Sequence, residues 1–247
     1  MTENGHYGLN MICFGQAKQG KSWLGDTTPA PRVVLDAEAG SRFTPSKKKI
    51  WNPVSESPPE ADGSWETAIV PVRAFRDVTK TFEWLNSGKH PFRSVILDSI
   101  SEIQQRAIDD IAGTNQMRQA DWGTLLRVCS DAIRKYRDLV TNPVRPLDAV
   151  VFIAMAAQRA DGTWYPFMQG RMATSMPYFV DLCAYIATVA QEDGTTRRRL
   201  FLASMPGYET GERVGGKLGT YIDIPDHDMH VVEKMLEKVR GSAEDSR

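Results

Sequence analysis

Short runs of apolar residues recur along the first two thirds of the chain, and several of them end at a polar side chain. These runs predict buried strands over residues 9–14, 32–36, 67–72, 94–98 and 149–154. Apolar residues at helical spacing predict helices over residues 78–86, 100–111, 122–140 and 232–239. Strands that alternate with helices are typical of a mostly parallel central sheet flanked by helices. The pattern therefore predicts an α/β fold.

The last third of the chain has a different pattern. Apolar runs over residues 183–189 and 200–203 are joined through a turn at residues 192–194, which predicts a C-terminal antiparallel hairpin extension of the sheet. Residues 221–224 predict one more short strand, whereas residues 41–66 are polar and lack a period, so they predict a long loop. A chain of 247 residues fits one large domain. We expect this domain to span residues 1–241, with a polar tail over residues 242–247.

The first apolar run leads into the sequence GQAKQGKS, residues 15–22. It matches the pattern G-x-x-x-x-G-K-S of phosphate-binding loops, whose backbone N–H groups surround an anion. A short helix over residues 21–26 can follow, and the N-terminus of a helix favours a phosphate. Because Lys21 can reach the terminal phosphates and Ser22 can ligate Mg²⁺, we predict that the chain binds ATP and Mg²⁺. The expected nucleotide-binding residues are Gly15, Gln16, Ala17, Lys18, Gln19, Gly20, Lys21, Ser22 and Trp23.

Three further strand ends carry polar side chains, and ligands of open α/β sheets bind at this edge. Glu38 follows the second strand, where a carboxylate can activate the water that attacks the γ-phosphate; the alternative is a solvated loop acid. Asp98 ends the fourth strand and can hold Mg²⁺ through water. Gln158 lies just beyond the fifth strand, either as a sensor of the γ-phosphate or as a plain strand-end amide. The catalytic candidates are thus Glu38, Lys21 and Gln158, and the metal candidates are Ser22 and Asp98.

Charge restricts the partners of the chain. The formal net charge is −1, so no bulk electrostatic attraction to nucleic acid exists and any DNA contact must be local. The candidate cations for such contact lie in loop-like segments and are Arg159, Arg171, Lys47, Lys48 and Lys49, the last three being equally typical of a solvated loop. His227 and His230 have a spacing that could bind metal, but no third ligand accompanies them. We interpret them as polar residues at a helix N-terminus.

Three cysteines lie far apart in apolar stretches, which indicates reduced core residues. Three tryptophans in polar surroundings favour packing under loops over base stacking; these are Trp51, Trp65 and Trp164. The sequence contains no segment that resembles a signal peptide and no run of membrane-spanning length. We therefore expect a cytoplasmic location and no membrane partner.

Four segments occur in the order found in RecA cores, which the chain resembles: residues 15–22, 33–38, 95–99 and 150–159. The resemblance implies that Glu38 activates water, that Asp98 serves Mg²⁺ and that Gln158 opens a second DNA-binding loop. The chain is similar in particular to small phage-encoded RecA-like core ATPases of the Sak type, over residues 8–215. Such cores bind nucleotide between neighbouring subunits, which implies a homo-oligomer.

A basic residue from the neighbouring subunit completes the nucleotide site of RecA-like cores. The resemblance transfers this role to Arg213, which lies in a polar, glycine-rich segment, although a solvated loop arginine is an equal alternative. Rival candidates lie at the start of the second hairpin strand and are Arg197, Arg198 and Arg199.

Two function classes remain open at this point. The leading hypothesis is an ATPase that binds single-stranded DNA in phage-type recombination or annealing and works as a homo-oligomer. The alternative is a nucleotide-gated scaffold that recruits a recombinase or single-strand-binding partner with little turnover. The presence of both Glu38 and Asp98 favours hydrolysis. A small-molecule kinase is poorly supported, since no arginine-rich lid segment lies between the fourth and fifth strands.

Overall fold

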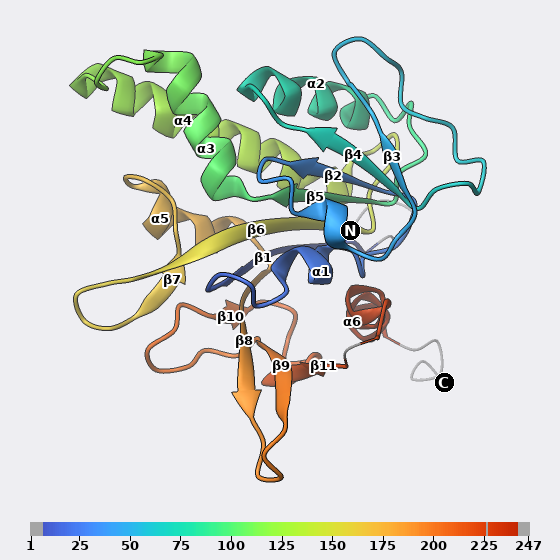
Figure 1. Ribbon diagram of the computed structural model, residues 1–247, viewed down its shortest axis with the longest axis vertical. Coiled ribbons are helices and arrows are strands. Elements are labelled where there is room, and N and C mark those ends of the chain that lie inside the picture. The colour runs from blue at the N-terminus through green and yellow to red at the C-terminus, as the bar shows by residue number, and fades with distance from the viewer. Residues whose placement is uncertain (1–6, 226, 242–247) are drawn as a thin grey trace.

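A computed structural model describes residues 7–225 and 227–241 of the protein (Figure 1). Its strands are β1 (Leu9–Gly15), β2 (Arg32–Asp36), β3 (Lys48–Ile50), β4 (Thr67–Pro71), β5 (Ser94–Asp98), β6 (Ala149–Gln158), β7 (Trp164–Pro166), β8 (Leu182–Ala190), β9 (Thr196–Phe201), β10 (Gly211–Glu212) and β11 (Tyr221–Ile224). They form one sheet in the order β11-β9-β8-β1-β6-β5-β2-β4-β3, with β10 beside β8 and β7 beside β6. The pairs from β8 through β1 to β3 are parallel, and β9, β10 and β11 pair antiparallel. The predicted mostly parallel sheet with an antiparallel C-terminal hairpin is confirmed.

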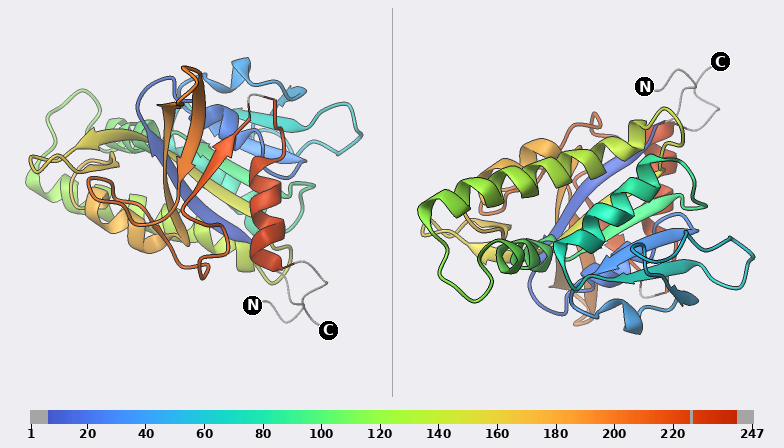
Figure 2. Two further views of the ribbon diagram at one scale, coloured as in Figure 1. Left: turned by 90° about the horizontal axis from the view of Figure 1, so that it is seen from below. Right: turned by 90° about the horizontal axis from the view of Figure 1, so that it is seen from above.

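Helices cover both faces of this sheet (Figure 2). They are α1 (Lys21–Gly25), α2 (Phe75–Asn86), α3 (Ile100–Ala112), α4 (Gln119–Arg137), α5 (Met172–Ser175) and α6 (Val231–Arg240), together with the 3-10 turns η1 (Ser41–Phe43), η2 (Asp138–Thr141) and η3 (Met176–Phe179). Side chains alternate along a strand, so β1 sends Ile12 and Phe14 into the core beneath α2, α3 and α4. It sends Met11 and Cys13 into the opposite core, beneath α1 and α6. The sheet is therefore buried on both sides, which explains the continuous apolar runs.

The segment over residues 41–66 is mostly irregular, as predicted, but it contains two short regular elements that the sequence did not indicate. The segment contains η1 and the parallel edge strand β3, and it is anchored by Trp51 and Trp65, which are 1% and 4% exposed. Both indole rings pack against Phe92, with ring centroids 5.6 Å and 6.0 Å away. The strand has three residues and its two last side chains are exposed, so it leaves no apolar pattern in the sequence. Packing under the loops is thereby confirmed for these two tryptophans; Trp164 lies half-buried in β7.

A buried polar network fixes the start of this segment against α1. Asp26 follows α1 and forms an ion pair with Arg32, with 3.1 Å between Oδ1 and Nη1. The same carboxylate accepts hydrogen bonds from the backbone N–H of Ser46 at 3.0 Å and from the hydroxyl of Thr67 at 3.2 Å. All four residues are less than a tenth exposed. Arg32 and Thr67 are the first residues of β2 and β4, so the network fixes Ser46 near the amino ends of these strands. Removing one partner of such a network would leave a buried polar group unsatisfied.

The three cysteines are buried with free thiols, as predicted. Burial raises the pKa of Cys13 to about 12, so this thiol stays protonated at neutral pH. Within residues 7–225 and 227–241, no helix is long and apolar enough to cross a membrane. Residues 242–247, predicted as a polar tail, lie outside the described residues.

Candidate nucleotide site

The loop after β1 forms the floor of a cavity at the carboxyl ends of the parallel strands. The cavity has a volume of about 660 Å³ and is lined mainly by the loop, with Glu38, Asp98 and Met155 among the other walls. Gly20 has a φ of 89°, a left-handed conformation that glycine adopts without strain, and α1 begins at the next residue. The strand, loop and helix start that the motif requires are therefore all present. All the predicted nucleotide-binding residues line the cavity except Gln19.

Lys21 lies at the base of this loop. Its Nζ atom donates hydrogen bonds to the carbonyl oxygens of Gly15 at 2.9 Å and Gln16 at 2.7 Å. Burial lowers the pKa of Lys21, opposed by neighbouring acidic groups that include Asp98 and Glu38. The two hydrogen bonds hold the ammonium group at the cavity wall, where phosphate oxygens can accept further hydrogen bonds from it.

Asp98 and Ser22 form the oxygen-rich side of the cavity. The register of the sheet aligns Asp98 of β5 with Ile153 of β6, and β6 in turn pairs with β1. The hydroxyl of Ser22 hydrogen-bonds the Asp98 carboxylate, which is 5% exposed. Mg²⁺ prefers hard oxygen ligands and completes its shell with phosphate oxygens and water, so these two residues fit the ion. In the described part of the chain, no three His, Cys, Asp or Glu side chains gather into a group that could hold a metal ion.

Glu38 projects over the cavity because of a turn built on Asp36. The Asp36 carboxylate accepts hydrogen bonds from the backbone N–H groups of Glu38 and Gly40, both at 3.2 Å, and from that of Ser41 at 3.0 Å. These bonds wrap residues 37–41 around the end of β2. The hydroxyl of Ser99, a buried residue at the N-terminus of α3, donates to the Glu38 carboxylate. Ser99 is therefore a site residue that the sequence interpretation missed.

Gln158 does not line the cavity. Strand β6 continues through Gln158, and the strand residue level with Gly15 is Met155. The Gln158 amide donates instead to the carbonyl oxygen of Gly162 at 2.8 Å, inside the β6–β7 hairpin. Met155 and Ala156 occupy the cavity wall at this position. A role of Gln158 in sensing the γ-phosphate remains a prediction.

The predicted DNA-binding cations lie apart from one another. Arg159 forms an ion pair with Glu209 at 2.6 Å and its guanidinium lies 4.6 Å from the Tyr165 ring centroid, whereas Arg171 is exposed at the start of α5. Lys48 donates to the carbonyl oxygens of Thr44 and Ser46. The run Lys47, Lys48 and Lys49 lies near the beginning of β3 and β4, at the amino ends of the strands and opposite the cavity.

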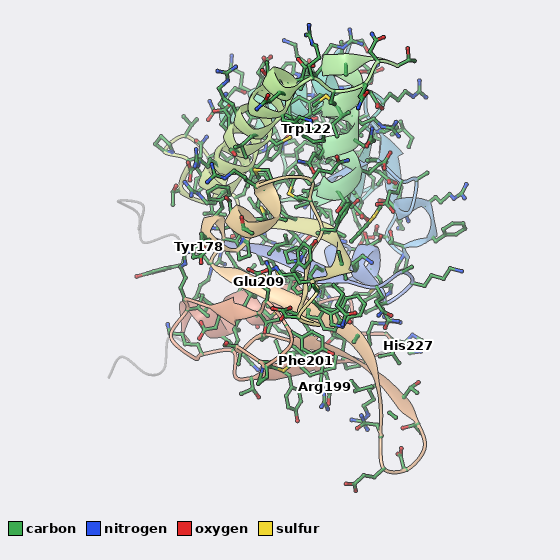
Figure 3. The ribbon with its side chains drawn as sticks, turned by 90° about the vertical axis from the view of Figure 1, so that its left-hand side faces the viewer. Trp122, Tyr178, Arg199, Phe201, Glu209 and His227 are labelled. Carbon is green, nitrogen blue, oxygen red and sulfur yellow. The ribbon has the colours of Figure 1, made fainter. Side chains whose placement is uncertain are left out.

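Arg213 also lies toward the amino ends of the strands. It follows β10, and its guanidinium donates to the carbonyl oxygen of Tyr178 at 3.0 Å. Figure 3 shows Tyr178 projecting from the surface, in agreement with its 77% exposure. Arg213 thus lies far along the sheet from its own phosphate loop, and its predicted role in a neighbouring subunit's site is untested. His230 contacts Glu233 at 2.8 Å at the start of α6, as expected for a helix-terminal residue.

The comparisons with known proteins decide the family. A family model described as an AAA domain matches residues 8–214. The chain belongs to the AAA domain family. This match covers the whole of β1 to β10 and includes every residue that lines the cavity. The AAA domain identifies the protein as a P-loop ATPase that binds nucleotide. A comparison with curated proteins found no match.

Replacing Asp98 by asparagine is expected to stabilise the isolated protein at neutral pH. Burial, with Asp36 and Glu38 adding to it, raises the pKa of Asp98 from 3.8 to about 6. The folded protein therefore binds this proton more tightly than the unfolded chain does. Protonation of Asp98 therefore adds to the free energy of unfolding. This stabilisation is complete below about pH 4 and is lost as the pH rises to about 6. A tenfold change in proton affinity corresponds to about 1.4 kcal/mol, so we expect a gain of roughly 1–3 kcal/mol in Asp98→Asn above pH 6.

Urea unfolding of the two proteins at several pH values measures this effect. The difference in unfolding free energy should be small at pH 4, grow up to pH 6 and remain constant above it. A difference that does not vary with pH would show that Asp98 is already ionised without penalty in the folded protein.

Proposed function

We propose that this AAA domain is a Mg²⁺-dependent ATPase in which Glu38 activates the attacking water. The observation that carries the proposal is the hydrogen bond from Ser99 to Glu38, because it holds a carboxylate beside a cavity whose other walls are the phosphate loop and Asp98. Lys21 would bind the terminal phosphates, and the Glu38 carboxylate would accept the proton of the attacking water. Ser22 and Asp98 would hold Mg²⁺, which would supply positive charge to offset the charge that develops on the phosphate oxygens.

We further propose that hydrolysis is coupled to single-stranded DNA, in a RecA-like protein of phage-type recombination or annealing that works as a homo-oligomer. Strand β6 supports this coupling, since it lines the cavity through Met155 and Ala156 and then runs outward to Arg159. A shift of β6 on nucleotide binding would reach the β6–β7 hairpin directly. Arg171 lies at the exposed start of α5, in the segment that follows this hairpin. Backbone phosphates are the ligands that two such arginines suit.

The alternative is a nucleotide-gated scaffold that recruits a single-strand-binding or recombination protein. It needs a bound nucleotide but no water-activating base. The presence of a positioned Glu38 together with Asp98 favours hydrolysis over this alternative.

Phosphate release from ATP, measured with and without single-stranded DNA over a series of protein concentrations, tests the proposal. We expect turnover that requires Mg²⁺, increases with DNA and increases with protein concentration as subunits assemble. Replacing Arg159 and Arg171 together by alanine should weaken DNA binding and reduce its salt dependence by about 0.7 in slope for each lost phosphate contact. Arg127→Ala, an exposed position on α4, is the matched control. Nucleotide binding without turnover under any of these conditions would support the scaffold, and unchanged DNA affinity in the double variant would remove these two arginines from the DNA site.

A further inference from the structure

The β8–β9 hairpin contacts the phosphate loop at two consecutive residues. Thr188 of β8 donates both its backbone N–H and its hydroxyl to Gln19 Oε1, at 2.7 Å and 2.9 Å. Arg198 of β9 lies against Gly20, so closely that a Cβ atom on Gly20 would be 2.8 Å from both Cδ and Nε of the arginine. Thr188 and Arg198 are direct partners across the two strands, and both therefore point to the face of the sheet that carries α1.

Close packing along β8 brings the hairpin to this position. β8 runs parallel to β1 and lies beside it (Figure 1). A Cβ atom on Gly15 would be 2.5 Å from the carbonyl oxygen of Ile186, so the backbones of the two strands approach without an intervening side chain. The phosphate loop thus leaves β1 already in contact with the hairpin.

Arg198 differs from the arginines on either side of it. Arg199 points to the other face, pairs with Asp223 at 2.6 Å and stacks over Tyr221 at 3.8 Å. Arg197 is exposed. Arg198 is half-buried, with its guanidinium 5.4 Å from the ring centroid of Trp23, and it takes part in none of the ion pairs found among the described residues. Its positive charge is therefore available to a ligand.

We propose that Arg198 is a second phosphate-binding cation of the nucleotide site, supplied in cis by the same chain that supplies the phosphate loop. The inference rests on the proposed function, since it assigns a further residue to the same nucleotide site. Gly20 and Trp23 line the cavity, and Arg198 flanks the wall that they form. A guanidinium group presents five N–H donors in a plane and binds phosphate through two of them at once. The Trp23 ring holds this plane by a cation–π contact, and the bond between Gln19 and Thr188 holds the hairpin to the loop.

This assignment separates two arginines that sequence alone treats as rivals. Arg213 lies at the amino ends of the strands and can serve only another subunit's phosphate loop, whereas Arg198 already touches the loop of its own chain. Arg198 therefore adds positive charge where the β- and γ-phosphates would lie. The affinity for ATP should depend on this arginine more than the affinity for AMP does.

Competition of ATP and AMP against a labelled ATP analogue tests the proposal on the full chain. Arg198→Ala should lower the affinity for ATP by about 10-fold to 100-fold, the range for a hydrogen bond to a charged group, and reduce its salt dependence. The affinity for AMP should change much less, and Arg198→Lys should recover part of the loss because it retains the charge. Arg197→Ala, at the neighbouring exposed arginine, is the matched control and should bind as the wild type does.

An Arg198→Ala protein that binds ATP as tightly as the wild type would overturn the proposal, as would equal losses of affinity for ATP and AMP. Wild-type ATP binding by Lys21→Ala would instead remove the phosphate loop itself from the proposed function, so the two failures are distinguishable. At an ATP concentration that the wild type binds but Arg198→Ala does not, mixing Arg198→Ala with Lys21→Ala subunits should not raise hydrolysis above that of the two proteins measured separately, because neither chain holds both groups. Recovery on mixing would show that Arg198 acts on a neighbour and would overturn the assignment in cis.

Discussion

Replacing Lys21 by alanine is expected to reduce the affinity for ATP by about 100-fold or more while the protein stays folded. Nζ of Lys21 lies within the loop, on the carbonyl oxygens of Gly15 and Gln16, and alanine offers no donor to a phosphate in that position. A hydrogen bond to a charged group contributes about 1.5–3 kcal/mol, and an ammonium group in this position can donate more than one to the terminal phosphates. The two carbonyl groups left behind lie at an open cavity, where water can replace the lysine, so the fold should persist.

Equilibrium binding of a labelled ATP analogue measures this loss, and thermal unfolding checks that the variant is folded. Lys47→Ala is the matched control, since it removes the same charge from the opposite end of the strands. A folded Lys21→Ala protein that binds ATP as well as the wild type would show that residues 15–22 are not the nucleotide site.

Replacing Glu38 by glutamine is expected to leave ATP bound but to slow its hydrolysis by about 100-fold or more. The amide has nearly the same shape as the carboxylate and can still accept the hydrogen bond from Ser99, but it cannot take the proton of the attacking water. Single-turnover hydrolysis with protein in excess over ATP isolates this step from product release.

Glu102 is the matched control for this prediction. It lies in the first turn of α3, four residues after Asp98 in the chain, but its carboxylate pairs with Arg106 at 2.9 Å. Glu102→Gln should hydrolyse ATP at nearly the wild-type rate. A wild-type rate in Glu38→Gln together with a slow rate in Glu102→Gln would move the role of base from the β2 loop to α3.

The sequence predicted the framework of the site because strands buried on both faces have continuous apolar runs. Asp98 and the phosphate loop each follow such a run, and parallel strands place their carboxyl ends at one edge. The start of a helix was harder to predict. Helix α2 begins at Phe75, three residues before the apolar pattern that starts at Val78. There the Asp77 carboxylate accepts the backbone N–H groups of Arg73 and Ala74 and so stabilises an earlier first turn.

The parts of the site that the sequence did not reveal depend on contacts between distant segments. The bond from Ser99 to Glu38 joins residues 61 positions apart, and its formation requires the turn built on Asp36. The contact of Arg198 with Gly20 depends on the register of the β8–β9 hairpin, because a shift by one residue would place a different arginine on the loop. The sequence of three successive arginines, residues 197–199, does not indicate which of them faces α1.

A structure of the protein with Mg²⁺ and a non-hydrolysable ATP analogue would show where the triphosphate binds. We expect it in the loop of residues 15–22, with Lys21 on the terminal phosphates and the metal beside Ser22 and Asp98. We also expect a water molecule between the Glu38 carboxylate and the γ-phosphate. A triphosphate bound elsewhere, or a Glu38 carboxylate turned away from the γ-phosphate with no water between them, would contradict the proposed function.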